Sequence, residues 1–175
     1  MREYEKAFLA RFFIIFFALF AILLFAPPVP LNSAIAGIEA SLMHSSGVPV
    51  AVDGTVLSLG ASSAEIVNEC SGLVMVILLA SLLYSSDIPE NRRRLALLAF
   101  TPFLLLFNIA RLYATLYAYF AAHQLFEAVH VILWFVDSAV VLACWYYAFR
   151  GRAGFFNDLR GVLRRRHSCS QGRRS

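Results

Sequence analysis

Long uninterrupted hydrophobic stretches, separated by short polar segments, dominate the pattern of this chain. The four longest stretches cover residues 8–26, 67–84, 95–120 and 130–149. Each is close to the ~20 residues that a helix needs to cross a ~30 Å hydrocarbon layer. The third is longer and contains Pro102, which predicts a kink. The pattern therefore predicts an all-α, polytopic membrane bundle of four transmembrane helices.

The overall composition supports a membrane protein. Hydrophobic residues make up 60% of the 175 positions and charged residues only 15%, whereas soluble domains are about 45–50% apolar and about 25% charged. A soluble globule of this length has too little interior to bury so much apolar surface. The composition therefore excludes an ordinary soluble enzyme, a disordered chain and a disulfide-stapled secreted module.

The basic residues predict how the helices are oriented. All but one of the 15 Lys and Arg residues fall in patches at residues 2–11, 92–94 and 150–174. Cytoplasmic loops are enriched in Lys and Arg, so all three patches and both termini are expected inside the cytoplasmic membrane. The loops at residues 27–66 and 121–129 contain no Lys or Arg and then face outward. Charge in patches of this kind indicates membrane topology rather than a nucleic-acid partner.

Residues 1–149 are predicted to form a single membrane-embedded domain, followed by a basic cytoplasmic tail at residues 150–175. In the tail, apolar positions between 155 and 163 are flanked by arginines, which is typical of an amphipathic helix on anionic lipid. The first hydrophobic stretch has an alternative interpretation. A basic start, an apolar run at residues 12–26 and the sequence Ala34-Ile35-Ala36 also fit a cleaved signal peptide.

The outer loop at residues 27–66 is predicted to have structure of its own. Apolar residues at helical spacing predict a short helix over residues 32–43. An Asp53-Gly54 pair within the apolar run at residues 50–57 predicts a β-hairpin. Two roles for this loop are open: a lid that covers the helix ends, or a strand edge that pairs with an extended substrate peptide.

Polar side chains within the predicted spans are candidates for function, because their burial in lipid is costly. Three of them lie on different helices at a similar depth near the outer surface, namely Cys70, Arg111 and His130. A thiolate is a nucleophile, an imidazole transfers protons and a guanidinium stabilises a developing oxyanion. Together the three side chains suit acyl transfer at the outer face of the membrane.

Neighbouring residues extend this candidate site. A position in the first turn of a helix and a nearby arginine both favour an anion, which predicts a lowered pKa for the Cys70 thiol. Asn108 lies one turn before Arg111 and shares its face. Asp137 lies two turns beyond His130 and is predicted to be a structural partner of Arg111 or Asn108.

His123, seven residues before His130, is an alternative residue for proton transfer. A haem held by these two histidines is disfavoured, because both would lie on one helix rather than on opposite sides of the iron. The sequence has no Gly-rich phosphate loop, dinucleotide fingerprint or paired-Cys zinc spacing. No cofactor and no metal is therefore predicted.

The candidate residues resemble the motifs of the exosortase/archaeosortase family of membrane cysteine transpeptidases. Members carry a Cys-Ser-Gly-like motif at a helix start, an Asn-x-x-Arg motif on a later helix and a His or Arg on the next. The matching residues here are Glu69-Cys70-Ser71-Gly72-Leu73, Asn108-Ile109-Ala110-Arg111 and His130. Many bacterial members have a carboxylate two positions before the Cys, where this chain has Asn68.

The resemblance implies that Cys70 is the nucleophile, that Arg111 stabilises the thiolate or oxyanion, and that His130 supplies acid–base help. Supporting roles are predicted for Glu69, Ser71, Gly72, Asn108 and Asp137. The implied partners are exported proteins whose C-terminal tail carries a recognition motif, a transmembrane helix and a basic cluster. The new C-terminus would pass to a membrane lipid or another acceptor. The alternative function is a non-catalytic membrane subunit of a transport or secretion system.

Overall fold

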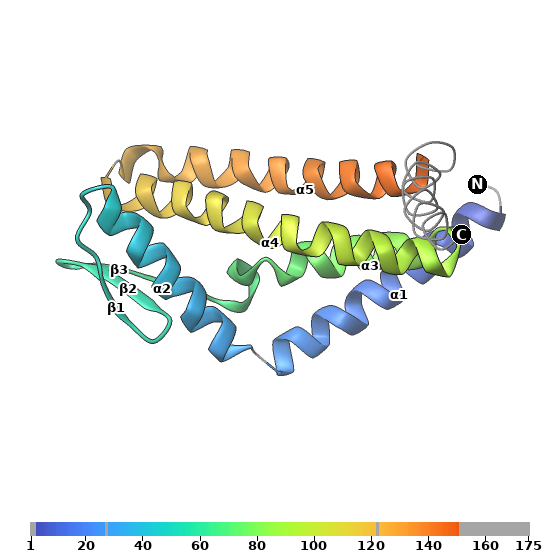
Figure 1. The fold of residues 1–175 in the computed structure, drawn as a ribbon, viewed down its shortest axis with the longest axis horizontal. Helices are drawn as coiled ribbons and strands as arrows, with labels where there is room; N and C mark the ends of the chain where they lie inside the picture. Colours follow the sequence, from blue (N-terminus) through green and yellow to red (C-terminus); the bar gives the residue numbers. More distant parts are fainter. Residues whose placement is uncertain (1–2, 27, 122, 151–175) are drawn as a thin grey trace, which may run out of the picture.

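The computed structural model describes residues 3–26, 28–121 and 123–150, and most of them are helical. The helices are α1 (Glu3–Phe25), α2 (Val29–Ser45), α3 (Leu73–Ser85), α4 (Glu90–Ala121) and α5 (Phe126–Arg150), with 3-10 turns η1 (Asn68–Ser71) and η2 (His123–Leu125). Helices α1, α3, α4 and α5 form an elongated bundle, and α2 lies with a small sheet at one end (Figure 1). This architecture confirms the predicted all-α membrane fold.

Within the described residues, three helices are long and apolar enough to cross a membrane: α1, α4 and α5. Helix α3 has 13 residues and therefore spans about 20 Å, less than a full hydrocarbon layer. The stretch predicted as a span at residues 67–84 is divided, because Gly72 adopts a left-handed conformation with φ 78° between η1 and α3. Helix α3 contacts α1, α4 and α5 and so lies at the centre of the bundle.

The core of the bundle lies between α3, α4 and α5. Leu79 and Leu83 of α3, Leu104 of α4 and Val141 of α5 are fully buried there, and Phe12 of α1 packs against them. The opposite faces of α1 and α5 expose large apolar side chains. Lipid is as apolar as these side chains, so close packing rather than escape from water holds such helices together.

The segment between α1 and η1 forms a compact unit, here called the cap (residues 29–65). Its strands are β1 (Ala51–Asp53), β2 (Val56–Leu59) and β3 (Ser62–Glu65), in the antiparallel order β1-β2-β3. The predicted hairpin is confirmed, since Asp53 pairs with Val56 across a turn that contains Gly54 at φ 61°. The third strand was not predicted, and α2 is longer at both ends than the predicted residues 32–43.

The cap packs on α4 through a second hydrophobic core. Ile35 and Met43 of α2, Leu57 of β2, and Leu112 and Leu116 of α4 are buried together. Helix α2 also contacts η1 and the first two strands. One face of α2 is therefore covered by protein rather than by lipid or solvent.

Three further predictions concern Pro102, the first helix and the C-terminal tail. Pro102 lies within α4, which continues through it as one helix. Helix α1 packs along α3, and the alternative of a signal peptide stays open. The predicted amphipathic tail lies outside the described residues, apart from Arg150 at the end of α5.

Candidate active site

Cys70 lies in η1, the short turn that leads into α3. Its backbone N–H donates to the Val67 carbonyl at 2.9 Å. The Ser71 hydroxyl donates to the Asn68 carbonyl at 2.6 Å and accepts from the Leu73 N–H at 3.3 Å. Ser71 thereby satisfies one of the N–H groups that have no partner at a helix start. Cys70 thus lies before α3. The predicted position in the first turn of the helix is wrong.

Gly72 allows α4 to approach this turn closely. Its φ of 78° is strained for any residue with a side chain, and a Cβ there would lie 2.9 Å from the Cβ of Asn108. Because this space is open, the Asn108 amide donates to the Cys70 carbonyl at 2.7 Å. The structure therefore brings into direct contact two motifs that lie 38 residues apart in the sequence.

Arg111 is buried on α4, one turn beyond Asn108. Its Nη1 lies 3.5 Å from the Asn108 Oδ1, and its Nε lies 3.1 Å from the Asp137 Oδ2 on α5. The two charged side chains are only 8% and 14% exposed, respectively. The predicted pairing of Arg111 with Asp137 is confirmed. Along α4, this polar group occupies the boundary between the bundle core and the cap core.

His130 lies on α5, two turns before Asp137, and interacts electrostatically with its carboxylate. The imidazole stacks on Phe126 with 5.7 Å between ring centroids. Its Nδ1 is buried and has no hydrogen-bond partner in the described part of the chain. Among those residues, no hydrogen bond joins His130 to Cys70 or Arg111.

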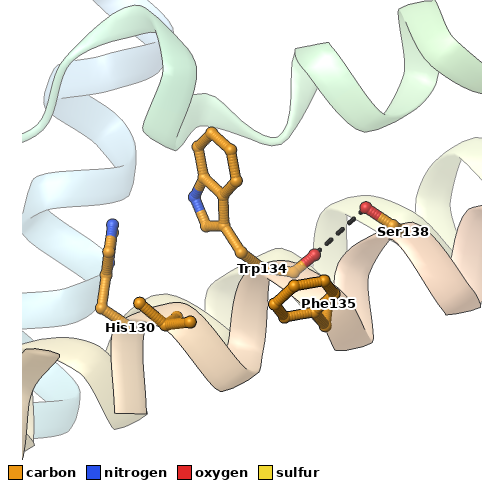
Figure 2. A pocket seen from close by; sticks show the side chains of 5 residues that line it. His130, Trp134, Phe135 and Ser138 are labelled. Carbon is orange, nitrogen blue, oxygen red and sulfur yellow. Dashed lines mark hydrogen bonds between the residues drawn. The ribbon is translucent and has the colours of Figure 1, made fainter. Parts of the chain in front are cut away.

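A groove of about 330 Å³ runs beside His130 along α5. The His130 and Trp134 side chains project from the same side of the helix, and the Ser138 hydroxyl donates back to the Trp134 carbonyl at 3.2 Å (Figure 2). The groove is lined by His130, Val131, Trp134, Phe135 and Ser138. Mostly apolar walls around one imidazole suit an apolar chain segment rather than a small polar ligand.

Burial raises the pKa of the Cys70 thiol above its ordinary value. A hydrogen bond from the Val67 backbone and the positive charge of Arg111 lower it, and the exposed carboxylate of Glu69 raises it further. The predicted lowering of this pKa is wrong, because the cost of removing a thiolate from water exceeds the help from Arg111. The resting thiol is therefore protonated at neutral pH.

Sequence reasoning missed two buried polar residues of the cap, Asn32 and Glu39. Asn32 of α2 is 4% exposed and donates through Nδ2 to the Asn68 Oδ1 at 2.9 Å. Glu39, two turns further along α2, is fully buried, and neither carboxylate oxygen has a hydrogen-bond partner among the described residues. Burial raises the pKa of Glu39 to about 8. Asn32 and Glu39 are seven residues apart and share a helix face with Ile35. This spacing was the one signal in the sequence that both side chains are buried.

Two other titratable side chains are those of His123 and Cys144. His123 belongs to η2, and the structure does not describe its side chain. Cys144 is buried on α5, in the bundle core. Across residues 3–26, 28–121 and 123–150, no cluster of three or more His, Cys, Asp or Glu side chains is arranged to hold a metal ion.

Comparison with known protein families adds an independent observation. The family model described as transmembrane exosortase (Exosortase_EpsH) matches residues 2–147, which include every candidate site residue. The chain belongs to the transmembrane exosortase family. No match was found among curated proteins or among solved structures. Exosortase membership confirms the resemblance seen in the motifs, and it implies in general a membrane cysteine transpeptidase or protease.

Proposed function

We propose that this protein cleaves the C-terminal sorting tail of exported proteins at the outer face of the cytoplasmic membrane. It then transfers the new C-terminus to a membrane lipid or another acceptor. The observation that carries the proposal is the contact between the two family motifs, in which Asn108 holds the Cys70 carbonyl at 2.7 Å. The same contact places Arg111 where its charge acts on the Cys70 thiol.

In the proposed reaction, His130 removes the proton from the Cys70 thiol, and the thiolate attacks the scissile carbonyl of the substrate. The tetrahedral intermediate carries a negative oxygen that Arg111 stabilises. When the intermediate collapses, the peptide C–N bond breaks, a thioester remains on Cys70, and the leaving amine takes the proton from His130. An acceptor nucleophile then attacks the thioester, which releases the product and restores the thiol.

The protonated resting state of Cys70 makes a base necessary. Because desolvation raises the pKa of the half-buried Cys70 thiol, we expect its proton to be removed when substrate binds. The free Nδ1 of His130 supplies a site for this proton. Hydrogen bonds between catalytic groups are often long before substrate is present, so the missing direct contact with Cys70 is compatible with this role.

Asp137 has a positioning role in this proposal. Its carboxylate holds the Arg111 guanidinium through Nε, while Nη1 donates to the Asn108 Oδ1 at 3.5 Å. A fixed positive charge in a water-poor site stabilises a developing oxyanion more strongly than the same charge in water.

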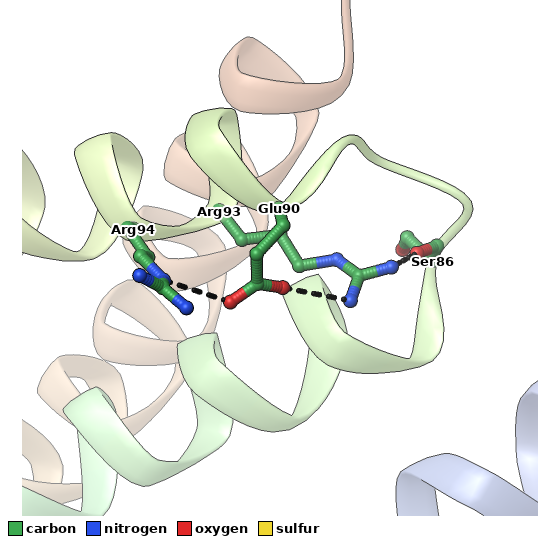
Figure 3. Close-up of polar contacts among 4 residues, drawn as sticks. All are labelled: Ser86, Glu90, Arg93 and Arg94. Carbon is green, nitrogen blue, oxygen red and sulfur yellow. Dashed lines mark hydrogen bonds and ion pairs between the residues drawn. The ribbon is translucent and has the colours of Figure 1, made fainter.

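The distribution of charge supports the proposed orientation. The start of α1, the turn from α3 to α4 and the end of α5 lie at the end of the bundle opposite the cap (Figure 1). In that turn, Glu90 pairs with Arg94 at 2.9 Å and with Arg93 at 3.4 Å, and Arg93 also donates to the Ser86 carbonyl (Figure 3). The cap has no Lys or Arg. By the positive-inside rule, this distribution of charge supports an orientation with the cap and the Cys70 turn outside.

The test compares two cysteine variants in the native host. With Cys70→Ala, we expect normal amounts of the protein in the membrane and accumulation of exported proteins that keep their C-terminal tail. Cys144→Ala is the matched control, because this cysteine is buried in the bundle core, and it should process normally. Mass spectrometry of C-terminal peptides measures the outcome. Normal processing in Cys70→Ala would refute the proposal.

The buried ion pair also supports a second candidate, a non-catalytic subunit of a transport or secretion system. In that case, the pair between Arg111 and Asp137 would serve helix association alone. The exchange Arg111→Asp with Asp137→Arg would then restore function to either single variant, and Cys70 would be dispensable. Loss of function in the exchanged pair, together with a requirement for Cys70, would favour the transpeptidase.

A further inference from the structure

Asn68 lies two residues before Cys70, and its side chain joins η1 to two other elements. The Oδ1 accepts a hydrogen bond from the Asn32 amide of α2 at 2.9 Å. The Nδ2 donates to the Leu23 carbonyl, in the last turn of α1, at 3.5 Å. The backbone carbonyl of Asn68 accepts from the Ser71 hydroxyl. One residue thus connects α1, α2 and the turn that carries the thiol.

The Leu23 carbonyl requires an external donor. In a continuing helix its partner would be the N–H of the fourth residue onward, but that residue is Pro27, and Pro28 follows it. Proline has no N–H group, so the end of α1 has no backbone donor for this carbonyl. Leu23 is itself buried. The Asn68 amide is the group that satisfies it.

The bond to α2 lies in equally dry surroundings. Asn32 is 4% exposed, and its own Oδ1 has no partner among the described residues. Among the described residues, the one side-chain hydrogen bond of the Asn32 amide is the bond that its Nδ2 donates to Asn68. A hydrogen bond between a buried amide and a half-buried one is directional, which makes it suitable for fixing the η1 backbone.

We propose that Asn68 is a positioning residue for Cys70. Asn68 holds the η1 turn against α1 and α2, while Asn108 holds the same turn against α4. The thiol is thereby kept at a fixed place relative to Arg111. This inference rests on the proposed function, in which Cys70 is the nucleophile.

The predicted effect of losing Asn68 concerns rate rather than binding. The groove beside His130 lies on α5, and none of its lining residues contacts Asn68 by a hydrogen bond. The groove should therefore stay intact in the variant, whereas the thiol no longer meets the scissile carbonyl in a productive geometry. A displacement of the reacting thiol by about 1 Å can lower the rate of the chemical step by about 100-fold.

The experiment uses the full-length chain with Cys144 and Cys169 replaced by Ala, so that Cys70 is the sole thiol. Asn68→Ala and Asn32→Ala are compared, singly and together, with Asn91→Ala, an exposed asparagine at the start of α4. Two quantities are measured. The first is the processing of exported proteins in the host, and the second is the rate of Cys70 alkylation by iodoacetamide in isolated membranes from pH 6 to 10. The pH range of the assay is about four units wide, which covers a thiol with a raised pKa.

With Asn68→Ala, processing should fall on the order of 10- to 100-fold, while alkylation becomes faster and its pH midpoint moves down as the thiol is exposed. A general loss of folding would instead reduce the amount of protein and broaden the alkylation kinetics. Asn32→Ala should cause a smaller change in the same direction. The double variant should match Asn68→Ala, because both substitutions remove one shared hydrogen bond.

Normal processing and unchanged alkylation in Asn68→Ala would overturn the inference, provided that Cys70→Ala blocks processing in the same host. If Cys70→Ala itself processes normally, the proposed function fails. The alkylation measurement still stands in that case, because it requires no substrate and reports directly on whether Asn68 holds the turn. If Asn68→Ala does not accumulate, Asn32→Ala decides between these outcomes by the same two measurements.

Discussion

The replacement Glu39→Gln tests whether a buried acid limits the stability of the cap. Glu39 lies on the face of α2 that packs on α4, is fully buried, and has no hydrogen-bond partner for either oxygen among the described residues. Burial raises its pKa from 4.5 to about 8 in the folded protein. The neutral acid is therefore the form that the folded cap accommodates.

The sign and size of the effect follow from proton binding. Between pH 4.5 and about 8, folded Glu39 keeps a proton that the unfolded chain has released. The free energy of unfolding must then decrease as the pH rises, by up to about 1.4 kcal/mol per pH unit. Across the whole interval, the upper bound is about 5 kcal/mol. Glutamine has nearly the same shape and does not ionise, so this loss should be absent in Glu39→Gln.

The assay is thermal unfolding of the purified protein in detergent, followed by tryptophan fluorescence from pH 5 to pH 9. We expect wild type to lose stability over this range and Glu39→Gln to lose clearly less, so that the variant is the more stable protein at pH 9. Glu65→Gln, on the exposed strand β3, is the matched control and should behave as wild type. Parallel pH curves for wild type and Glu39→Gln would refute the reasoning.

Three further substitutions have defined expectations. Gly72→Ala forces a side chain into a left-handed backbone and toward Asn108, so it should lower both processing and thermal stability. The control is Gly47→Ala, which has open space around it and should lower thermal stability alone. Arg111→Ala should destabilise the protein by about 3–5 kcal/mol in chemical unfolding, because it leaves the buried Asp137 carboxylate without a counter-ion; equal stability would contradict a buried pair. His130→Gln should slow processing by about 10²- to 10⁴-fold with unchanged protein amounts in immunoblots, and a normal rate would exclude it as the base.

The overall bundle was predictable because membrane thickness imposes helix lengths that are visible in the hydrophobic pattern. The same argument identified Cys70 and Arg111 as neighbours, since depth along two helices limits which side chains can meet. The pairing of Arg111 with Asp137 followed from the cost of an isolated charge in lipid.

The local structure around Cys70 was not predictable in the same way. Residues 67–84 were predicted as one span, and that prediction did not include a left-handed conformation at Gly72, so the turn η1 was read as the start of a helix. The expected low pKa of the thiol depended on that misplacement. Burial by the cap, which no local pattern encodes, then reversed the direction of the shift.

The cap shows a second kind of limit. Strand β3 has the sequence Ser62-Ser63-Ala64-Glu65, without the alternation that predicts a strand, and it forms because β2 provides its partner. Asn32 and Glu39 lie within the helix that was predicted over residues 32–43, but no role was predicted for either side chain. Their burial became apparent only once α4 and η1 covered their side of α2.

The long sequence separation of the contacts at Cys70 has a consequence for how the protein is made. The Asn108 bond spans 38 residues, so a ribosome delivers the thiol to the membrane well before the residue that holds it. Arg111 then enters lipid on α4 without a counter-ion until Asp137 follows on α5, a later helix of the described part of the chain. An unpaired arginine is poorly tolerated in lipid. The arrival of α5 therefore both retains α4 in the membrane and completes the surroundings of the thiol, so that partly inserted chains carry no assembled site.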